Sequence, residues 1–207
     1  SLDDTEKKHV TTEYTIDSNY MVDGVGLVVG GHLSKGELFV GQKLFLGPDS
    51  NGDFKQVQVK SLHKLCISSE RLYEGQHATL AIKVLGKKDP LRRQNIKKGM
   101  VLLATDKNPK DLVTREFSAE IKVLHHSTTI DVGYSPMIHI GVVRQSAKIL
   151  AITDHNGKGT VMRTGSTAVV RFQFISSHEY IKKGTKVIFR EGRARGVGKV
   201  LEIHHGI

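Results

Sequence analysis

Short apolar runs that alternate with polar residues recur along the whole 207-residue chain, and turn residues separate them at close intervals. The runs span residues 11–16, 26–30, 43–46, 56–62, 78–85, 101–104, 115–124, 137–145, 148–153, 167–175, 187–189 and 197–203. Alternation and β-branched residues of this kind predict strands, and only residues 89–97 leave room for one or two helical turns. Many short strands at such spacing are typical of β-barrels or β-sandwiches. We therefore predict an all-β fold.

Turn residues and one polar segment divide the chain into two halves. Residues 49–53 and 155–159 combine Asp or Asn with Gly and predict hairpin loops, whereas Lys98–Gly99 and Lys183–Gly184 predict tight reversals. Residues 105–111 are polar, contain a proline and lack periodicity, which favours an interdomain linker. The length suits two domains of about 100 residues each or one larger barrel.

Positive charge is abundant and unevenly placed. The formal net charge is +10, with 17 Lys and Arg against 14 Asp and Glu in residues 1–111, and 14 against 7 in residues 112–207. Two groups of cations stand out: Lys87, Lys88, Arg92, Arg93, Lys97 and Lys98 in the first half, and Lys182, Lys183, Lys186, Arg190, Arg193, Arg195 and Lys199 in the second. A polyanion suits such groups, because phosphates that are neutralised release counterions. A solvated surface without a partner is the alternative.

The segment from Arg190 to Gly198 concentrates this charge in a glycine-bearing turn between two strand-like runs. Arg190, Arg193 and Arg195 carry forked donors that match phosphate oxygens, and the glycines let a ligand approach the backbone. A contact with a phosphate backbone is one interpretation. A solvated hairpin that only promotes solubility is the other.

Cysteine usage and the N-terminal residues indicate the cellular setting. Cys66 stands alone, which excludes an intramolecular disulfide and a cysteine metal cluster and favours a reducing, cytoplasmic setting. We interpret Cys66 as a small buried apolar residue, because no pattern supplies the base that a nucleophile would need. No apolar run reaches membrane-spanning length, and residues 1–8 lack an initiating Met and the apolar core of a signal peptide. We therefore expect a processed or excised fragment.

Motifs for catalysis, metal binding and nucleotide binding are missing from the sequence. Residues 157–160 resemble part of a phosphate loop, but they have the wrong spacing and lie between strands with no helix to follow. His125–His126 and His204–His205 lie in or next to strand-like runs, so the two rings of each pair point to opposite faces and cannot readily chelate one ion. We predict no catalytic residue, no metal site and no cofactor in this chain, which leaves a binding role.

The order of strands and turns resembles the second and third domains of translational GTPases of the elongation factor Tu type. In the first half the resemblance rests on residues 22–31, 35–42, 73–78 and 98–102. In the second half it rests on residues 117–121, 133–136, 183–184 and 190–193, and the last of these motifs is most similar to the eukaryotic GTP-binding protein 1 subgroup. The resemblance implies two consecutive β-barrels: a translation-protein barrel at residues 9–106 and an elongation factor Tu C-terminal-type barrel at residues 112–207.

The same resemblance implies two RNA-binding surfaces. The closing glycine-arginine turn corresponds to a surface for the tRNA T-stem, and its residues here are Arg190, Gly192, Arg193, Arg195 and Gly196. The pocket for the aminoacylated end of tRNA corresponds to Asp17, Ser18, Tyr20, Ser61, Leu62, His63 and Lys64. Ser61 stands where elongation factor Tu carries an acidic residue, so this contact differs from that of the family.

The resulting hypothesis is an RNA-binding region that presents a basic surface to tRNA or ribosomal RNA and packs against a nucleotide-binding domain of its own. In the parent protein that domain would bind GTP and Mg²⁺ and hydrolyse GTP, with a nucleotide-exchange factor as a further partner. A cytoplasmic protein without membrane contact is expected. The alternative is a protein-docking β-barrel module of a GTPase with no direct RNA role.

Overall fold

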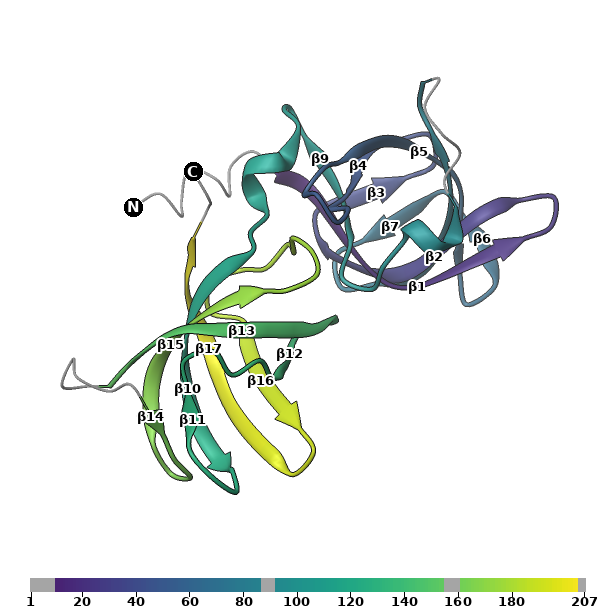
Figure 1. Ribbon diagram of the computed structural model, residues 1–207. Coiled ribbons are helices and arrows are strands. Elements are labelled where there is room, and N and C mark those ends of the chain that lie inside the picture. The colour runs from purple at the N-terminus through teal and green to yellow at the C-terminus, as the bar shows by residue number, and fades with distance from the viewer. Residues whose placement is uncertain (1–9, 87–91, 155–160, 205–207) are drawn as a thin grey trace. The chain divides into compact units, whose positions relative to one another are not determined.

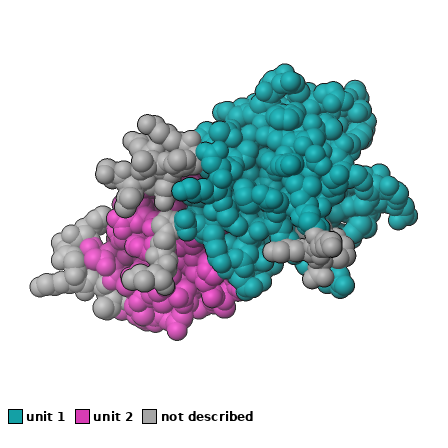
Figure 2. Space-filling view, turned by 90° about the horizontal axis from the view of Figure 1, so that it is seen from above, with its two compact units in different colours: residues 1–112 teal, residues 113–207 magenta. Residues whose placement is uncertain are grey.

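The computed structural model describes residues 10–86, 92–154 and 161–204. The chain divides into two compact units, residues 1–112 and 113–207, which Figure 2 colours separately. Each unit contains one closed barrel of six strands (Figure 1). The helices of the described residues are two short 3₁₀ turns, η1 (Arg93–Asn95) and η2 (Pro109–Leu112). The prediction of an all-β fold with two barrels is confirmed.

The described residues of the first unit form nine strands. They are β1 (Val10–Val22), β2 (Gly26–Lys35), β3 (Glu37–Phe39), β4 (Lys43–Gly47), β5 (Lys55–Lys64), β6 (Ile67–Ser69), β7 (Arg71–Tyr73), β8 (His77–Val84) and β9 (Val101–Thr105). Six of them pair in the order β4-β9-β1-β2-β8-β5, and the pairing of β4 with β5 closes the barrel. Strand β6 extends the sheet beyond β5, and β3 pairs with β7.

In the part of the second unit that the structure describes there are eight strands. They are β10 (Glu116–His125), β11 (Ile130–Asp131), β12 (Met137–Ile140), β13 (Val143–Thr153), β14 (Val161–Met162), β15 (Thr167–Phe174), β16 (Lys186–Glu191) and β17 (Ala194–His204). The closed barrel has the order β10-β15-β13-β12-β16-β17, with β17 pairing back to β10. Strands β11 and β14 form a separate two-stranded sheet.

Alternating burial explains why these runs form barrels. Along β15 the even-numbered side chains from Ala168 to Phe174 are buried, whereas Arg171 on the same strand is exposed. Phe117 of β10 packs against Phe172 and Phe174, with ring centroids 5.2 and 5.0 Å apart. The burial of these closely packed apolar side chains supplies the main stabilisation of each barrel.

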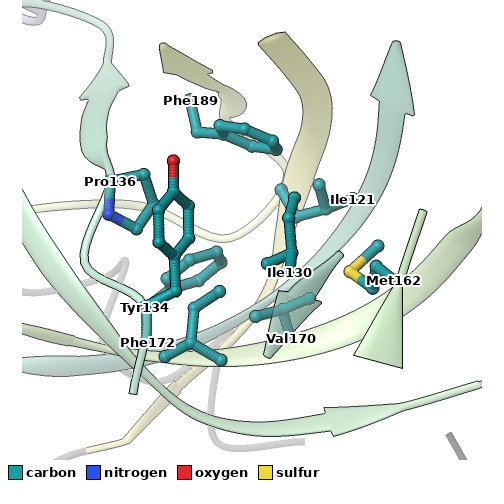
Figure 3. A pocket seen from close by; sticks show the side chains of 9 residues that line it. Ile121, Ile130, Tyr134, Pro136, Met162, Val170, Phe172 and Phe189 are labelled. Atoms are coloured by element: carbon teal, nitrogen blue, oxygen red, sulfur yellow. The ribbon is translucent and has the colours of Figure 1, made fainter. Parts of the chain in front are cut away.

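Side chains fill the interior of the second barrel. The space that remains among Ile121, Ile130, Phe172, Phe189 and their neighbours is only about 10 Å³ (Figure 3). A volume of this size is on the order of one water molecule. This space is too small to hold a ligand.

The turn between β5 and β6 corrects one prediction. Cys66 is exposed, so its interpretation as a buried apolar residue was wrong. Lys64 pairs with Ile67, which leaves Leu65 and Cys66 as the two central residues of the turn, and both have positive φ angles of 48° and 67°. A tight hairpin requires this backbone twist, and it turns both side chains away from the core.

The other local predictions have mixed outcomes. A 3₁₀ turn at η1 lies inside the predicted helical segment 89–97. The predicted loop at 49–53 is a hairpin loop. The Asp49 side chain closes it by accepting hydrogen bonds from the Asn51 and Asp53 N–H groups. Within the predicted linker 105–111, Pro109 is buried and begins η2. The predicted loop at 155–159 and the motif at 157–160 lie outside the described residues.

A buried polar network holds the segment after β15 against β13. The Gln145 side-chain oxygen accepts hydrogen bonds from the N–H groups of Ser176 and Ser177, at 3.1 and 3.2 Å. Its amide nitrogen donates to the Ser177 carbonyl and to the Glu179 carboxylate. Such a network is costly to break, because the polar groups around it have no access to water.

We therefore expect Gln145→Ala to lower the free energy of unfolding by about 2–3 kcal/mol, since the buried Ser177 N–H loses its acceptor and the buried Glu179 carboxylate loses a donor. Gln173→Ala is the matched control, because Gln173 is half-buried and donates one hydrogen bond, to Glu116. Its expected cost is below about 1 kcal/mol. Urea denaturation measures both, and equal losses would contradict this account of the network.

Candidate nucleic-acid interface

The arginine-rich segment near the C-terminus forms the β16–β17 hairpin. Glu191 pairs with Ala194, so Gly192 and Arg193 are the two central residues of the turn. Gly192 has a φ angle of +55°. A type II′ turn needs a positive φ at this first position, and glycine supplies it without steric cost. The hairpin therefore places Arg193 at its exposed tip.

Cross-strand register brings two arginines together on the outer face of the second barrel. Arg190 pairs directly with Arg195, and the row continues to Met137 on β12 and to His125 on β10. Directly opposed residues of antiparallel strands point to the same face. Both arginines are exposed.

Neighbouring rows on the same outer face carry four further cations. His139 of β12 pairs with Arg144 of β13 on one side and with Ile188 on the other, and the row runs on through Val197 to Lys122 of β10. Lys186 pairs with Lys199 in the row beyond. We define the basic face as Lys122, Arg144, Lys186, Arg190, Arg195 and Lys199, all of them exposed.

Glu191, the acidic residue next to the hairpin turn, does not neutralise this face. Glu191 pairs with buried Ala194 and so has the inward register, opposite to that of Arg190. Its carboxylate lies close to the Tyr134 hydroxyl. Burial and this contact with Glu191 raise the pKa of Tyr134 above its ordinary value. None of the ion pairs between described residues involves a member of the basic face.

His139 reports the positive potential of the basic face. Its pKa lies below the ordinary value, first because the ring is partly desolvated and then because Arg144 and Arg190 repel a proton on it. The geometry agrees, since Arg144 is its direct cross-strand neighbour and Arg190 lies one row away on β16.

The two glycines of β17 that precede Lys199 serve packing. An ideal Cβ on Gly196 would come within 1.9 Å of the Phe189 ring, and one on Gly198 within 1.7 Å of the Glu120 carbonyl oxygen. Gly196 is buried under that ring. The structure therefore accounts for Gly196 by its contact with Phe189, whereas Arg190, Gly192, Arg193 and Arg195 lie exposed at or beside the turn.

Sequence reasoning missed Arg144, Lys122 and His139. They stand far from the hairpin in the sequence, and only the strand order of the closed barrel brings β10 beside β17, β12 beside β16, and β13 beside β12. The alternation along residues 115–124 and 137–145 signals that Lys122 and Arg144 point outward, but it does not indicate which strands are neighbours.

The residues expected at the aminoacyl end fall on the first barrel. Ser18 pairs with Gly30, Gly30 with Thr79, and Thr79 with His63, so one row crosses β1, β2, β8 and β5. The next row on the same outer face contains Tyr20, Val28, Ala81 and Ser61. The structure thus brings Ser18, Tyr20, Ser61 and His63 onto one face.

The remaining expected residues of this group have other positions. Asp17 is the extra residue of a β-bulge between Ile16 and Ser18, and its carboxylate accepts a hydrogen bond from the Ser18 hydroxyl at 2.7 Å. Leu62 is fully buried in the core. Lys64 has the same register parity as Leu62, so it lies at the end of β5 on the opposite side from His63.

Other candidate groups contribute less. In the first cationic group, Arg92, Arg93, Lys97 and Lys98 are exposed, and Lys87 and Lys88 lie outside the described residues. Within residues 10–86, 92–154 and 161–204, no three His, Cys, Asp or Glu side chains come together in a way that could hold a metal ion. No helix in this part of the chain has the length and apolar character needed to cross a membrane.

Comparison with known proteins finds relatives that match almost the whole chain. The chain is 37% identical to GTP-binding protein 1 of Xenopus laevis over 199 residues, which is 96% of the chain. It is 38% identical to human GTP-binding protein 2 over 203 residues, or 98% of the chain. The chain is homologous to the elongation-factor-like GTP-binding proteins. The resemblance predicted from the sequence is confirmed.

A more distant relative extends the group. Elongation factor 1-alpha of Desulfurococcus mucosus is 30% identical over 199 residues, covering 89% of the chain. The chain spans only 28% of the GTP-binding protein 1, 32% of the GTP-binding protein 2 and 43% of the elongation factor. It corresponds to a C-terminal region of such proteins. No family model matches the chain.

Proposed function

We propose that the second barrel binds the phosphate backbone of a structured RNA, tRNA or ribosomal RNA, through the basic face and the Arg193 turn. The observation that carries the proposal is that six exposed cations, from strands β10, β13, β16 and β17, lie on one outer face. The region would act as part of a GTP-binding translation factor.

The charge of the basic face supports RNA over a protein partner. The cations of the basic face make no ion pair with the described acidic residues, so phosphates can replace counterions along it. Arginine matches phosphate oxygens with two parallel donors, which a solvated lysine cannot do. A protein-docking surface of ordinary type would instead have an apolar, charge-depleted centre.

The first barrel would hold the end of the same RNA. Ser18, Tyr20, Ser61 and His63 offer hydroxyl groups and an imidazole on one face, and Tyr20 is 50% exposed and able to stack on a base. The serine at position 61 removes the negative charge that elongation factor Tu carries there, so recognition of an aminoacyl group would differ. We propose Asp17 and Lys64 as supports of this site from the bulge and the strand end.

Nucleotide chemistry would belong to another domain of the full-length protein. We propose that a GTPase domain with GTP and Mg²⁺ accompanies the two barrels, that a nucleotide-exchange factor acts on it, and that the protein works in the cytoplasm.

The 207-residue chain has no phosphate loop. We expect it to show no saturable heat of binding in calorimetric titration with micromolar GTP, and a specific micromolar site would contradict this assignment.

Salt dependence tests the proposal. Binding of tRNA to the chain can be followed by fluorescence anisotropy between about 50 and 200 mM salt. The logarithm of the affinity should fall with the logarithm of the salt concentration at a slope of about −3 or steeper, since each phosphate contact contributes about 0.7 to 0.9. A nearly salt-independent interaction would favour the protein-docking alternative, because apolar contacts are little screened.

The low pKa of His139 predicts a pH dependence. A phosphate bound to Arg144 and Arg190 offsets their repulsion, so binding should raise the pKa of His139 and take up a proton. Affinity for tRNA should therefore increase as the pH falls from about 7.5 to about 5.5. His139→Gln should flatten this profile, and an unchanged profile in the variant would assign the effect to another group.

A further inference from the structure

We propose that the first barrel carries a separate anion site, formed by Asn19, Arg92, Arg93 and Gln94, that binds a phosphate group of a ligand. The site belongs to a different unit from the basic face, and it does not depend on the function proposed for that face. These four residues border a shallow hollow of about 600 Å³ that is wide open to solvent.

The geometry holds one arginine ready for a ligand. The Asn19 side-chain nitrogen donates to the Ile96 carbonyl oxygen at 2.9 Å, which fixes the orientation of the amide. Its oxygen accepts a hydrogen bond from Nε of Arg93 at 3.3 Å. This bond uses Nε of Arg93, so the edge formed by the two terminal nitrogens of the guanidinium can take a planar, bidentate partner.

The lining residues select a phosphate. Arg92 and Arg93 bring two positive charges that no ion pair between described residues neutralises, and the described lining contains no carboxylate. Gln94 adds a neutral amide donor. Tetrahedral phosphate oxygens match two guanidinium groups, and the open side of the hollow leaves room for a group attached to the phosphate.

The origin of the site in the sequence is long-range. Asn19 lies on β1 and the arginines at η1, more than 70 residues later. Asn19 has the opposite register parity to Ser18 and Tyr20, so it faces away from the proposed seat of the RNA end. The two sites can therefore be mutated independently.

Titration with inorganic phosphate tests the site. We expect saturable chemical-shift changes at residues 19 and 92–94 in ¹H–¹⁵N NMR spectra of the 207-residue chain, measured at constant ionic strength against chloride. Arg93→Gln should abolish them. Asn19→Ala should raise the apparent Kd about fivefold, because Arg93 loses its positioning bond.

Lys43→Gln is the control, since Lys43 is an exposed cation of β4 in the same unit and should leave the titration unchanged. Shifts that are spread over all surface cations, or that survive Arg93→Gln, would overturn the proposal. Two further titrations identify the source of the phosphate. Displacement of phosphate by a short RNA indicates a nucleic-acid backbone, and displacement by a nucleoside monophosphate alone indicates a free phosphorylated ligand.

Discussion

Replacing Arg190 and Arg195 together with Gln is expected to weaken tRNA binding about tenfold or more and to reduce the salt slope of log affinity by about 1.4 to 1.8. The two side chains are directly opposed on β16 and β17 and lie at the centre of a row of the basic face. Each lost arginine removes a charge-assisted contact with a phosphate. Anisotropy titrations at several salt concentrations measure both quantities.

A control variant separates the site from its charge. Lys148→Gln with Arg163→Gln removes the same net charge from exposed positions on the same barrel, at β13 and after β14, outside the basic face. Its salt slope should stay close to that of the native chain. Thermal midpoints should be unchanged in both variants, because exposed charges contribute little to stability. Equal losses in the two variants would mean that RNA responds only to net charge.

Gly196→Ala is expected to destabilise the second barrel by about 3 kcal/mol. The new Cβ would lie 1.9 Å from the Phe189 ring, which is itself only 3% exposed and cannot move without disturbing the core. Overpacking of this kind usually costs about 1–3 kcal/mol, and a rigid neighbour places the value at the upper end. Chemical denaturation of the native chain and the variant measures the loss.

A double variant identifies the cause. Phe189→Leu shortens the side chain that covers Gly196, so Gly196→Ala should cost less in its presence than alone. We expect a coupling free energy of about 1–2 kcal/mol between the two positions. Additive losses would show that Gly196 is required for a reason other than its contact with Phe189.

The fold could be predicted from the sequence because its elements are local. Alternating burial along runs such as Thr167–Phe174 is written into the order of the residues, and turn residues mark the ends of strands. Cys66 was misjudged for a physical reason. A thiol is usually buried, but here a two-residue turn with positive φ angles overrides that preference.

The candidate sites were predictable only where their residues are close in sequence. Arg190, Arg193 and Arg195 belong to one hairpin, so recognising the turn in the sequence is enough to predict that they lie close together. Lys122 and Arg144 join them only because β10 pairs with β17 and β13 lies next to β12 in the barrel, and the contact of Asn19 with Arg93 depends on a tertiary approach. Hydrophobic periodicity shows that such residues face outward, but it carries no information on which strands become neighbours.

Chemical-shift mapping with tRNA tests the central claim most directly. In ¹H–¹⁵N spectra of the native chain, substoichiometric tRNA should perturb and broaden the backbone signals of β12, β16, β17 and the Gly192–Arg193 turn first. Signals of the β11–β14 sheet should change little. Perturbations that leave β16 and β17 unaffected while tRNA binds elsewhere on the chain would contradict the assignment of the basic face as the RNA surface.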